Sequence, residues 1–336
     1  MIVAGDIGGT KCSLALFELQ EDRLISKFES TYPSRRYPGL EVVVARFLSE
    51  KPVRIHQDRI SAFSFGIAGP VVQGTVRTPN LPWTVSVELL RERFATRSVA
   101  LLNDLEATGY GVLILKKDEI KVLNRGKADP QGNLAIIAAG TGLGEAFIVA
   151  SKQGPIPIPS EGGHTDFAPR NDREMSLLAH LMKRFDRVSY ERVLSGPGLL
   201  NIYTFLREST PTAPTSWFDT EVEKTGDPSA VVSQAALDGK CPLCKLALEM
   251  FVEIYGREAG NLALTVKATG GVFICGGIAP KILPRLTGGL FMKAFRDKGR
   301  LEKLLASIPV SVVLNPKTAL HGAADYARRF LCNTMP

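Results

Sequence analysis

Two stretches of the chain share one pattern of apolar and polar positions. Residues 2–17 (IVAGDIGGTKCSLALF) have the pattern of an apolar strand, a tight turn from Asp6 to Lys11 and a second apolar strand. Residues 135–150 (AIIAAGTGLGEAFIVA) repeat strand, glycine-rich turn and strand, and placing Gly8 over Gly142 superposes the two apolar runs. One such hairpin is as compatible with a plain turn as with a ligand site. Its repetition predicts a duplicated nucleotide-binding scaffold.

The two turns suggest a phosphate site. Glycines adopt positive φ angles and let an anion approach the backbone N–H groups of a turn, and Asp6 would face a cation bound to the phosphate. The chain contains neither GxxxxGK[ST] nor a GxGxxG that leads from a strand into a helix. A P-loop kinase and a Rossmann dehydrogenase are therefore disfavoured.

Beyond the hairpins, the apolar periodicity predicts alternating helices and strands, which is the α/β class. In the first half we expect a strand at 60–67, a proline-containing loop around Asn80, a strand at 99–102, and helices near 39–50, 86–96 and 105–115. In the second half we expect strands at 270–275 and 310–314, and helices near 172–186, 189–195, 197–208, 242–268 and 316–331. Composition predicts a Pro-rich loop at 155–160 and a surface loop at 209–226, and Asp227-Pro228 is typical of a helix start.

Bulk properties narrow the protein class. With 336 residues, 45% hydrophobic and 22% charged, the chain is long enough for two cores and ordinary for a globular protein. It has no apolar run of membrane-spanning length and no leader-like N-terminus, so we expect a cytoplasmic protein without a membrane partner. The net charge of +7 is spread over short groups such as Arg35-Arg36 and Lys116-Lys117. Solvated faces explain these groups, and we expect no nucleic-acid partner.

The five cysteines are expected to be reduced thiols. Cys241 and Cys244 have zinc-like spacing, but no second CxxC or His pair completes a set of four ligands. The pair is therefore interpreted as a buried helix start, and no structural zinc is assigned.

Several polar residues are candidates for chemistry. Asp104 follows an apolar strand, where it could act as a general base or cap the next helix. Glu161 and His164 flank two glycines, a pattern that suits a polar sugar better than a metal ion. Glu191 follows Ser189-Tyr190 and, from its local sequence, could be only part of a capping motif.

These segments together resemble the bacterial glucokinases of the hexokinase, heat-shock-protein and actin-like superfamily, and the similarity covers residues 2–331. The resemblance implies a two-lobed actin-like (ribonuclease H-like) ATPase fold with a duplicated βββαβαβα core and an interdomain cleft. The small lobe would comprise 1–113 and 317–336, and the large lobe 114–316. The motifs that carry the resemblance are GDIGGT at 5–10, LND at 102–104, GTGLG at 140–144, EGGHTDFAP at 161–169, ERVLSGPG at 191–198 and GVFICGGI at 271–278.

The resemblance also implies a role for each motif. Asp104 would accept the proton of the sugar 6-hydroxyl as it attacks the γ-phosphate of ATP, giving glucose 6-phosphate and ADP. Sugar hydroxyls would bind Asn80, Asn103, Glu161, His164 and Glu191. The phosphates and hydrated Mg²⁺ would lie against Asp6, Gly8, Gly9, Thr10, Thr141 and Gly142, with no direct metal ligand assigned. Gly276 and Gly277 would lie by the adenosine, and a homodimer is expected.

Several alternatives are weighed at this point. Lys11 stands where many members of this branch carry Asn, and it could contact a phosphate or be solvated. The related ROK family of repressors and sugar kinases shares the DIGGTK turn, but residues 165–200 lack the cysteines of its zinc motif. A kinase for mannose, N-acetylglucosamine or another hexose is the main alternative function. A sugar-responsive regulator or a filament-forming actin-like ATPase is a weaker one.

Overall fold

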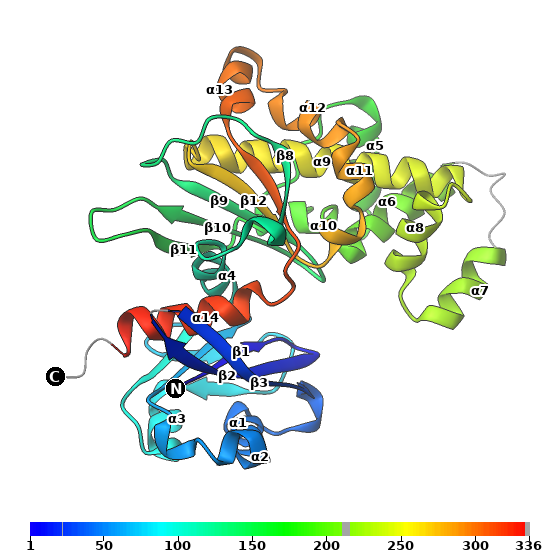
Figure 1. Cartoon of the computed structure of the whole chain (residues 1–336). Helices are drawn as coiled ribbons and strands as arrows, with labels where there is room; N and C mark the ends of the chain where they lie inside the picture. Colours follow the sequence, from blue (N-terminus) through cyan, green and yellow to red (C-terminus); the bar gives the residue numbers. More distant parts are fainter. Residues whose placement is uncertain (22, 210–215, 333–336) are drawn as a thin grey trace. The chain divides into compact units, whose positions relative to one another are not determined.

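The structure, a computed structural model, describes residues 1–21, 23–209 and 216–332 (Figure 1). The chain divides into two compact units. The first comprises residues 1–117, 157–159 and 315–336, and the second comprises 118–156 and 160–314. Each unit is built around its own sheet.

The sheet of the first unit has the strand order β3-β2-β1-β4-β7. Strands β1 and β2 are antiparallel, whereas β1, β4 and β7 run parallel to one another. The strands are β1 (Ile2–Ile7), β2 (Lys11–Gln20), β3 (Arg23–Pro33), β4 (Ala62–Ile67) and β7 (Val99–Asn103), beside a ribbon of β5 (Thr75–Arg77) and β6 (Thr84–Ser86).

Alternate residues of β1 enter two different cores, as the period of a strand requires. Val3 and Ile7 pack with α1 (Leu40–Ser49) and α3 (Val87–Phe94), whereas Ile2 and Ala4 pack with α4 (Asp104–Val112) and α14 (Thr318–Phe330). The sheet is therefore covered on both faces. A short α2 (Lys51–Arg54) follows α1.

The sheet of the second unit repeats this design. Its order is β11-β10-β9-β12-β13-β8, in which β9 pairs antiparallel with β10 and parallel with β12, and β12 is parallel to β13. The first five strands thus have the order of the first sheet, β9, β10, β12 and β13 also run in the directions of β1, β2, β4 and β7, and β8 is added at one edge. The strands are β8 (Ile120–Asn124), β9 (Leu134–Ala139), β10 (Leu143–Val149), β11 (Ile156–Ser160), β12 (Gly271–Cys275) and β13 (Val310–Val313).

Helices surround one long helix in the second unit. Helix α9 (Pro242–Thr265) carries a continuous series of buried residues that pack with β9 and β12 in the main core. It contacts α6 (Gly196–Glu208), α8 (Pro228–Leu237), α11 (Leu283–Thr287) and α12 (Leu290–Arg296), while α7 (Ser216–Thr225) packs on α8 and α13 (Glu302–Ser307) packs on α12. The unit also contains α5 (Asp172–Leu181) and α10 (Ile278–Lys281) (Figure 1).

Most predicted elements are present, and four are corrected. Residues 156–160 form β11 rather than a loop, because this strand lies at the edge of its sheet, where proline need not donate a hydrogen bond. Residues 216–225 of the predicted surface loop form α7, and 210–215 lie outside the described residues. The helix expected at 189–195 is only a 3₁₀ turn, η5 (Tyr190–Arg192), and the helix expected at 172–186 ends at Leu181. Strands β3 and β8 were not predicted.

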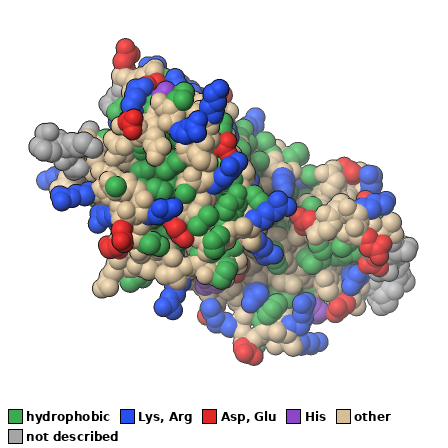
Figure 2. All heavy atoms as spheres, turned by 90° about the horizontal axis from the view of Figure 1, so that it is seen from below, with side chains coloured by type: hydrophobic (Ala, Val, Ile, Leu, Met, Phe, Trp, Pro, Cys, Tyr) green, Lys and Arg blue, Asp and Glu red, His purple; other side chains and the backbone are tan. Residues whose placement is uncertain are grey.

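The distribution of charged side chains on the surface does not indicate a further binding site. In the face drawn in Figure 2, Lys and Arg side chains lie in separate groups among acidic and apolar ones. Across the described ranges, no helix combines the length and apolar character of a membrane span.

Candidate functional site

The turn between β1 and β2 is held in shape by hydrogen bonds within the first unit. Gly8 N donates to Lys11 O at 3.0 Å, Ser34 Oγ donates to Gly8 O at 2.7 Å, and Ser34 N donates to Thr10 O. Thr10 and Lys11 are exposed. The turn is thus fixed by contacts to the backbone, and the glycines leave its surface bare of side chains.

Asp6 lies one residue from the end of β1. It pairs with Gly66 of β4, and Gly66 in turn pairs with Leu102 of β7. Burial raises the pKa of the Asp6 carboxyl, and the charge of Lys11 partly offsets the effect. A neighbouring cation would favour the ionised form of such a carboxyl.

Asn80 contacts the same turn. A Cβ added at Gly9 would lie 2.6 Å from Cβ of Asn80, so the proline-containing loop packs directly on the glycine. The structure therefore brings together a predicted sugar residue and a predicted phosphate residue within one unit.

Asn103 begins helix α4 with a capping box. Its Oδ1 accepts from Leu105 N at 2.9 Å, its backbone N donates to Glu106 Oε2, and its Nδ2 donates to Gly69 O at 3.1 Å. The amide retains one further N–H donor for a ligand. Asn103 thus ties the start of the helix to the loop that follows β4.

Asp104 is the first residue of α4, and Asn103 is the N-cap; the alternative in which Asp104 caps the helix is therefore wrong. Its Oδ1 accepts from Leu105 N at 2.9 Å. The helix dipole stabilises a negative charge at this position. A Cβ on Gly66 would lie 2.6 Å from Cβ of Ala107, so this glycine lets α4 approach the sheet between Asp6 and Asp104.

The second hairpin has a shorter turn than the first. Ala139 pairs with Leu143 around residues 140–142, whereas Ile7 pairs with Cys12 around residues 8–11. Gly8 therefore corresponds to Gly140, and the alignment of Gly8 with Gly142 is wrong by two residues. Thr141 is exposed at the tip of the turn, and Gly140 N donates to Gly142 O at 2.8 Å.

Glu191 is bound to this second turn. Its Oε2 accepts from Leu143 N at 3.0 Å and would lie 2.5 Å from a Cβ added at Gly142. The side chain thus reaches from η5 to the hairpin, a role that a capping motif would not require. This contact spans 48 residues and has no local sequence signal.

Glu161 precedes the 3₁₀ turn η4 (Gly162–His164), whose last residue is His164, and both side chains are exposed. Nε2 of His164 lies 3.9 Å from Oε2 of Glu161. A Cβ at Gly163 would collide with Leu143 O, and one at Gly162 would collide with the Glu145 carboxyl. The two glycines therefore allow η4 to lie directly on β10.

Gly276 and Gly277 lie on the other side of the second turn. Gly276 has φ +84°, and a Cβ there would collide with Ala139 backbone atoms, whereas a Cβ at Gly277 meets no atom within 4 Å. The second unit therefore gathers Thr141, Gly142 and Gly276 around the end of β9, with Glu191 and the η4 turn beside β10.

A buried acid pair beside η4 was not predicted from the sequence. Glu145 on β10 is 3% exposed and Glu258 on α9 is 5% exposed. Burial, and secondarily the contact with Glu258, raises the pKa of Glu145 to about 8. Burial also raises the pKa of Glu258, although hydrogen bonds from Asn261 and Tyr190 oppose the effect. No sequence signal identifies the pair, because strand and helix meet only in the folded unit.

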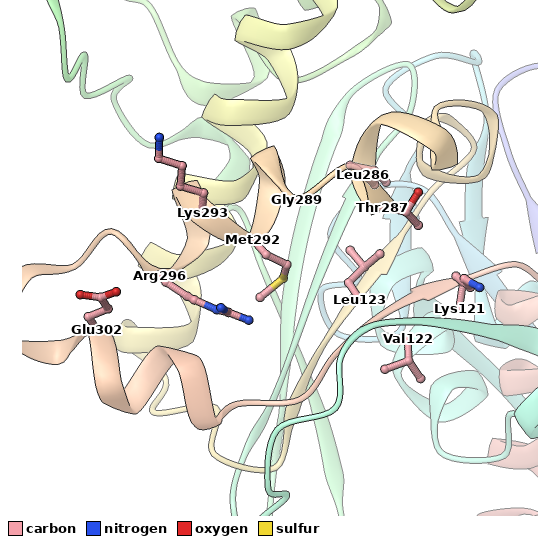
Figure 3. Close-up of a pocket in the computed structure, with 10 residues that line it drawn as sticks. All are labelled: Lys121, Val122, Leu123, Leu286, Thr287, Gly289, Met292, Lys293, Arg296 and Glu302. Atoms are coloured by element: carbon pink, nitrogen blue, oxygen red, sulfur yellow. The ribbon is translucent and has the colours of Figure 1, made fainter.

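A pocket of about 580 Å³ lies elsewhere in the second unit, between β8 and the α11–α12 segment (Figure 3). Lys121, Leu123, Met292 and Arg296 are among its lining residues, and Arg296 Nη2 donates to Asn124 Oδ1 at 3.0 Å. None of the predicted site residues lines it. The pocket therefore does not locate the predicted chemistry.

The cysteine pair begins helix α9, as predicted. Cys241 is the N-cap, its Sγ accepts from Cys244 N at 3.1 Å, and Pro242 occupies the first turn. All five cysteines are free; four are buried and Cys332 is partly exposed. Among the described residues, no group of three or more His, Cys, Asp or Glu side chains could hold a metal ion.

Two sheets that share an order of five strands, each with a glycine turn between its central strand and the antiparallel neighbour (β1–β2 and β9–β10), define the actin-like, ribonuclease H-like class of ATPases and sugar kinases. Within this class the chain belongs to the glucokinase family, whose sequence model matches residues 3–330. The chain is 43% identical to the glucokinase of Synechocystis sp. over 96% of each chain. It is 42% identical to that of Nostoc sp. over 98% of this chain and 99% of the relative.

Solved structures agree with this family. A glucokinase from an Antarctic psychrotroph has a TM-score of 0.82 at 30% identity, with 98% of each chain covered. A ROK family glucokinase from Streptomyces griseus has a TM-score of 0.63 at 22% identity, over 98% of this chain and 99% of the other, and shares the fold.

Proposed function

We propose that this chain transfers the γ-phosphoryl group of ATP to the 6-hydroxyl of glucose, giving glucose 6-phosphate and ADP. The observation that carries the proposal is the placement of Asp104, the first residue of α4, directly after β7 at the same edge of the sheet as the Asp6 turn, with β4 between the two strands. Family membership supports glucose as the acceptor. The Streptomyces griseus enzyme of the same fold was solved with glucose and AMPPNP, which supports ATP as the donor.

Asp104 is the proposed general base. At the start of α4 its carboxylate is ionised by preference, and it accepts the proton of the 6-hydroxyl as the hydroxyl oxygen attacks the γ-phosphorus and the bond to the ADP oxygen breaks. Phosphoryl transfer needs mainly positioning and neutralisation of charge. Asn103 therefore contributes by fixing the helix that carries the base.

The sugar is proposed to bind polar residues of both units. Asn80 and Asn103 would contact it from the first unit. Glu161, His164 and Glu191 would contact it from the second, where carboxylates accept from sugar hydroxyls in charge-assisted bonds. The bond from Leu143 N to Glu191 would then couple the sugar to the turn at Thr141 and Gly142.

The phosphates are proposed to bind Gly8, Gly9, Thr10 and Lys11 of the first unit and Thr141 and Gly142 of the second. The Asp6 carboxyl, whose pKa burial raises, fits a hydrated Mg²⁺ because that ion takes carboxylate oxygens together with waters and phosphates. When bound, Mg²⁺ neutralises phosphate charge. Gly276 and Gly277 would border the adenosine.

The wider assignments remain proposals. The functional lobes are residues 1–113 with 317–336, and 114–316. A homodimer is proposed from the family, with no nucleic-acid or membrane partner. A cytoplasmic location fits an enzyme that consumes ATP.

The test combines a panel of hexoses with one variant. Purified protein with Mg-ATP should release ADP with glucose, and Asp104→Asn should lower kcat by about 10²-fold or more while glucose still binds. Asp172→Asn is the matched control, because Asp172 is the first residue of α5 after the N-cap Asn171 and is exposed. Phosphorylation of mannose or N-acetylglucosamine but not of glucose would overturn the assignment of glucose as the substrate. A wild-type kcat in Asp104→Asn would show that Asp104 is not the general base.

A further inference from the structure

The acid pair Glu145–Glu258 lies directly behind the predicted sugar residues of the second unit. The Glu145 carboxyl is in contact with Gly162, so closely that a Cβ on this glycine would collide with it. Ser160 Oγ donates to Glu145 O at 3.0 Å and accepts from Gly162 N at 3.2 Å. Glu145 therefore supports η4, which carries His164 and follows Glu161.

Glu258 supports the neighbouring turn. Tyr190 of η5 hydrogen bonds to Glu258 through its hydroxyl, and Asn261 Nδ2 donates to Glu258 Oε2 at 2.8 Å and to the Tyr190 hydroxyl at 3.2 Å. Tyr190 N also donates to Thr165 O at 2.9 Å, which joins η5 to the end of η4. Tyr190 immediately precedes Glu191.

The contact between the two carboxyl groups requires one proton. Both groups are buried and hydrogen bonded to each other, and two carboxylates in such contact repel. Glu258 receives the hydrogen bonds of Asn261 and Tyr190, whereas Oε1 of Glu145 is buried without a hydrogen-bond partner among the described residues. The proton therefore resides on Glu145, which donates it to Glu258.

We propose that Glu145 and Glu258 are positioning residues for sugar binding, which hold η4 and η5 together through one shared proton. This inference rests on the proposed sugar contacts of Glu161, His164 and Glu191. When the proton is lost, two buried charges repel across the contact between β10 and α9, and the turns lose their common support. The affinity for glucose should then fall more than the affinity for ATP, because the Asp6 turn is held by Ser34 within the first unit.

The direction of the pH effect follows from the raised pKa of Glu145. A carboxyl whose pKa is higher in the folded state contributes stability below its unfolded value, and that contribution is lost as pH rises through the folded value of about 8. Other charged or titratable groups face the pair or its neighbours. These are Tyr255 and Arg257 of α9, Glu174 of α5, Tyr190, Arg170, Asp297 and Lys298.

Lys298 is the main competing explanation. Its Nζ donates to Arg257 O at 3.0 Å and to Asn261, and burial lowers its pKa. Loss of the Lys298 charge at alkaline pH would also change the glucose KM. A variant that removes only the Glu145 titration separates the two causes.

The experiment measures the KM for glucose, the KM for ATP and kcat between pH 7 and 9 in wild type and Glu145→Gln. In wild type the glucose KM should rise roughly threefold or more, with little change in the ATP KM. The glutamine amide is neutral and can donate to Glu258 at every pH, so the glucose KM of the variant should not change between pH 7 and 9. A pH-independent wild-type KM, or the same rise in Glu145→Gln, would overturn the proposal.

Two further measurements keep the test decisive. If Glu145→Gln does not fold, Glu258→Gln removes the second charge and should also give a flat KM; a wild-type rise would contradict the proposal. The infrared spectrum of wild type should show a protonated carboxyl band at pH 7 that disappears by pH 9, and absence of that band also overturns it. A protein that phosphorylates no glucose at any pH would refute the sugar assignment, and the infrared band would still report the shared proton.

Discussion

Gly276 and Gly277 are neighbours with different requirements. Gly276 has φ +84° and touches the Ala139 backbone, whereas Gly277 has φ −74° and open space where a Cβ would be. Gly276→Ala should therefore lower the free energy of unfolding by about 2 kcal/mol, because alanine is strained at this φ and collides with β9. Urea denaturation measures this change.

Gly277→Ala is the matched control for that loss. Its free energy of unfolding should stay within about 0.5 kcal/mol of wild type. If the backbone at this position borders adenosine, the new methyl group should raise the KM for ATP by about tenfold and leave the glucose KM unchanged. Equal destabilisation by both substitutions would contradict the structural distinction, and an unchanged ATP KM would place adenosine elsewhere.

At the scale of elements, helix α4 links stability to catalysis. Asn103→Ala removes the bonds to Leu105 N and to Gly69 O. We expect a loss of about 1 kcal/mol in unfolding free energy, and a fall in kcat of roughly tenfold because Asp104 is no longer held in place. Thermal unfolding and steady-state kinetics measure the two effects.

Helix α3 supplies the control for this prediction. Ser86 caps α3 in the same way, with Oγ accepting from Leu89 N at 3.1 Å. Ser86→Ala should cost a similar free energy, about 1 kcal/mol, without a change in kcat. If both variants lost kcat equally, the loss would reflect general destabilisation rather than the position of the base.

Helices and strands with a local signal in the sequence were predicted, and those without one were missed. The two hairpins, β4 and the capped start of α8 were predicted because apolar runs and Asp227-Pro228 are local features; Asp227 Oδ1 accepts from Ala230 N at 3.1 Å. Strand β11 was missed because its prolines indicate a loop unless the strand is known to be at an edge. Strand β3 was missed because it is mostly polar and partly exposed.

The candidate site was predictable only in part. The glycine turns and Asp104 have local signals in the sequence. The bond of Glu191 to Leu143, the packing of Asn80 on Gly9 and the contact of Glu145 with Glu258 join residues far apart in the chain. Such contacts depend on the folded arrangement of strands and helices, which no single segment encodes.

At the scale of the molecule, the two units share one sheet design but carry different additional segments. Each sheet has a glycine turn between its central strand and the antiparallel neighbour. The first unit adds the proposed base on α4, whereas the second inserts η4, η5 and helices α5 to α8 between β11 and α9. The proposed sugar residues are thereby divided between the units, so that neither unit alone holds the full set.

This division predicts that glucose changes the relation of the units in solution. A ligand bound by residues of both units stabilises whichever arrangement lets both sets reach it, and closure of domains around a substrate is a common way for enzymes to exclude water. The radius of gyration from small-angle X-ray scattering should therefore fall when saturating glucose is added. Two controls should leave the radius of gyration unchanged. One is Glu191→Ala at a glucose concentration too low for this variant to bind the sugar, and the other is wild type with a hexose that the enzyme does not phosphorylate. If calorimetry shows glucose bound to wild type while the scattering curve stays the same, the sugar does not draw the two units together, and its contacts must lie within one unit.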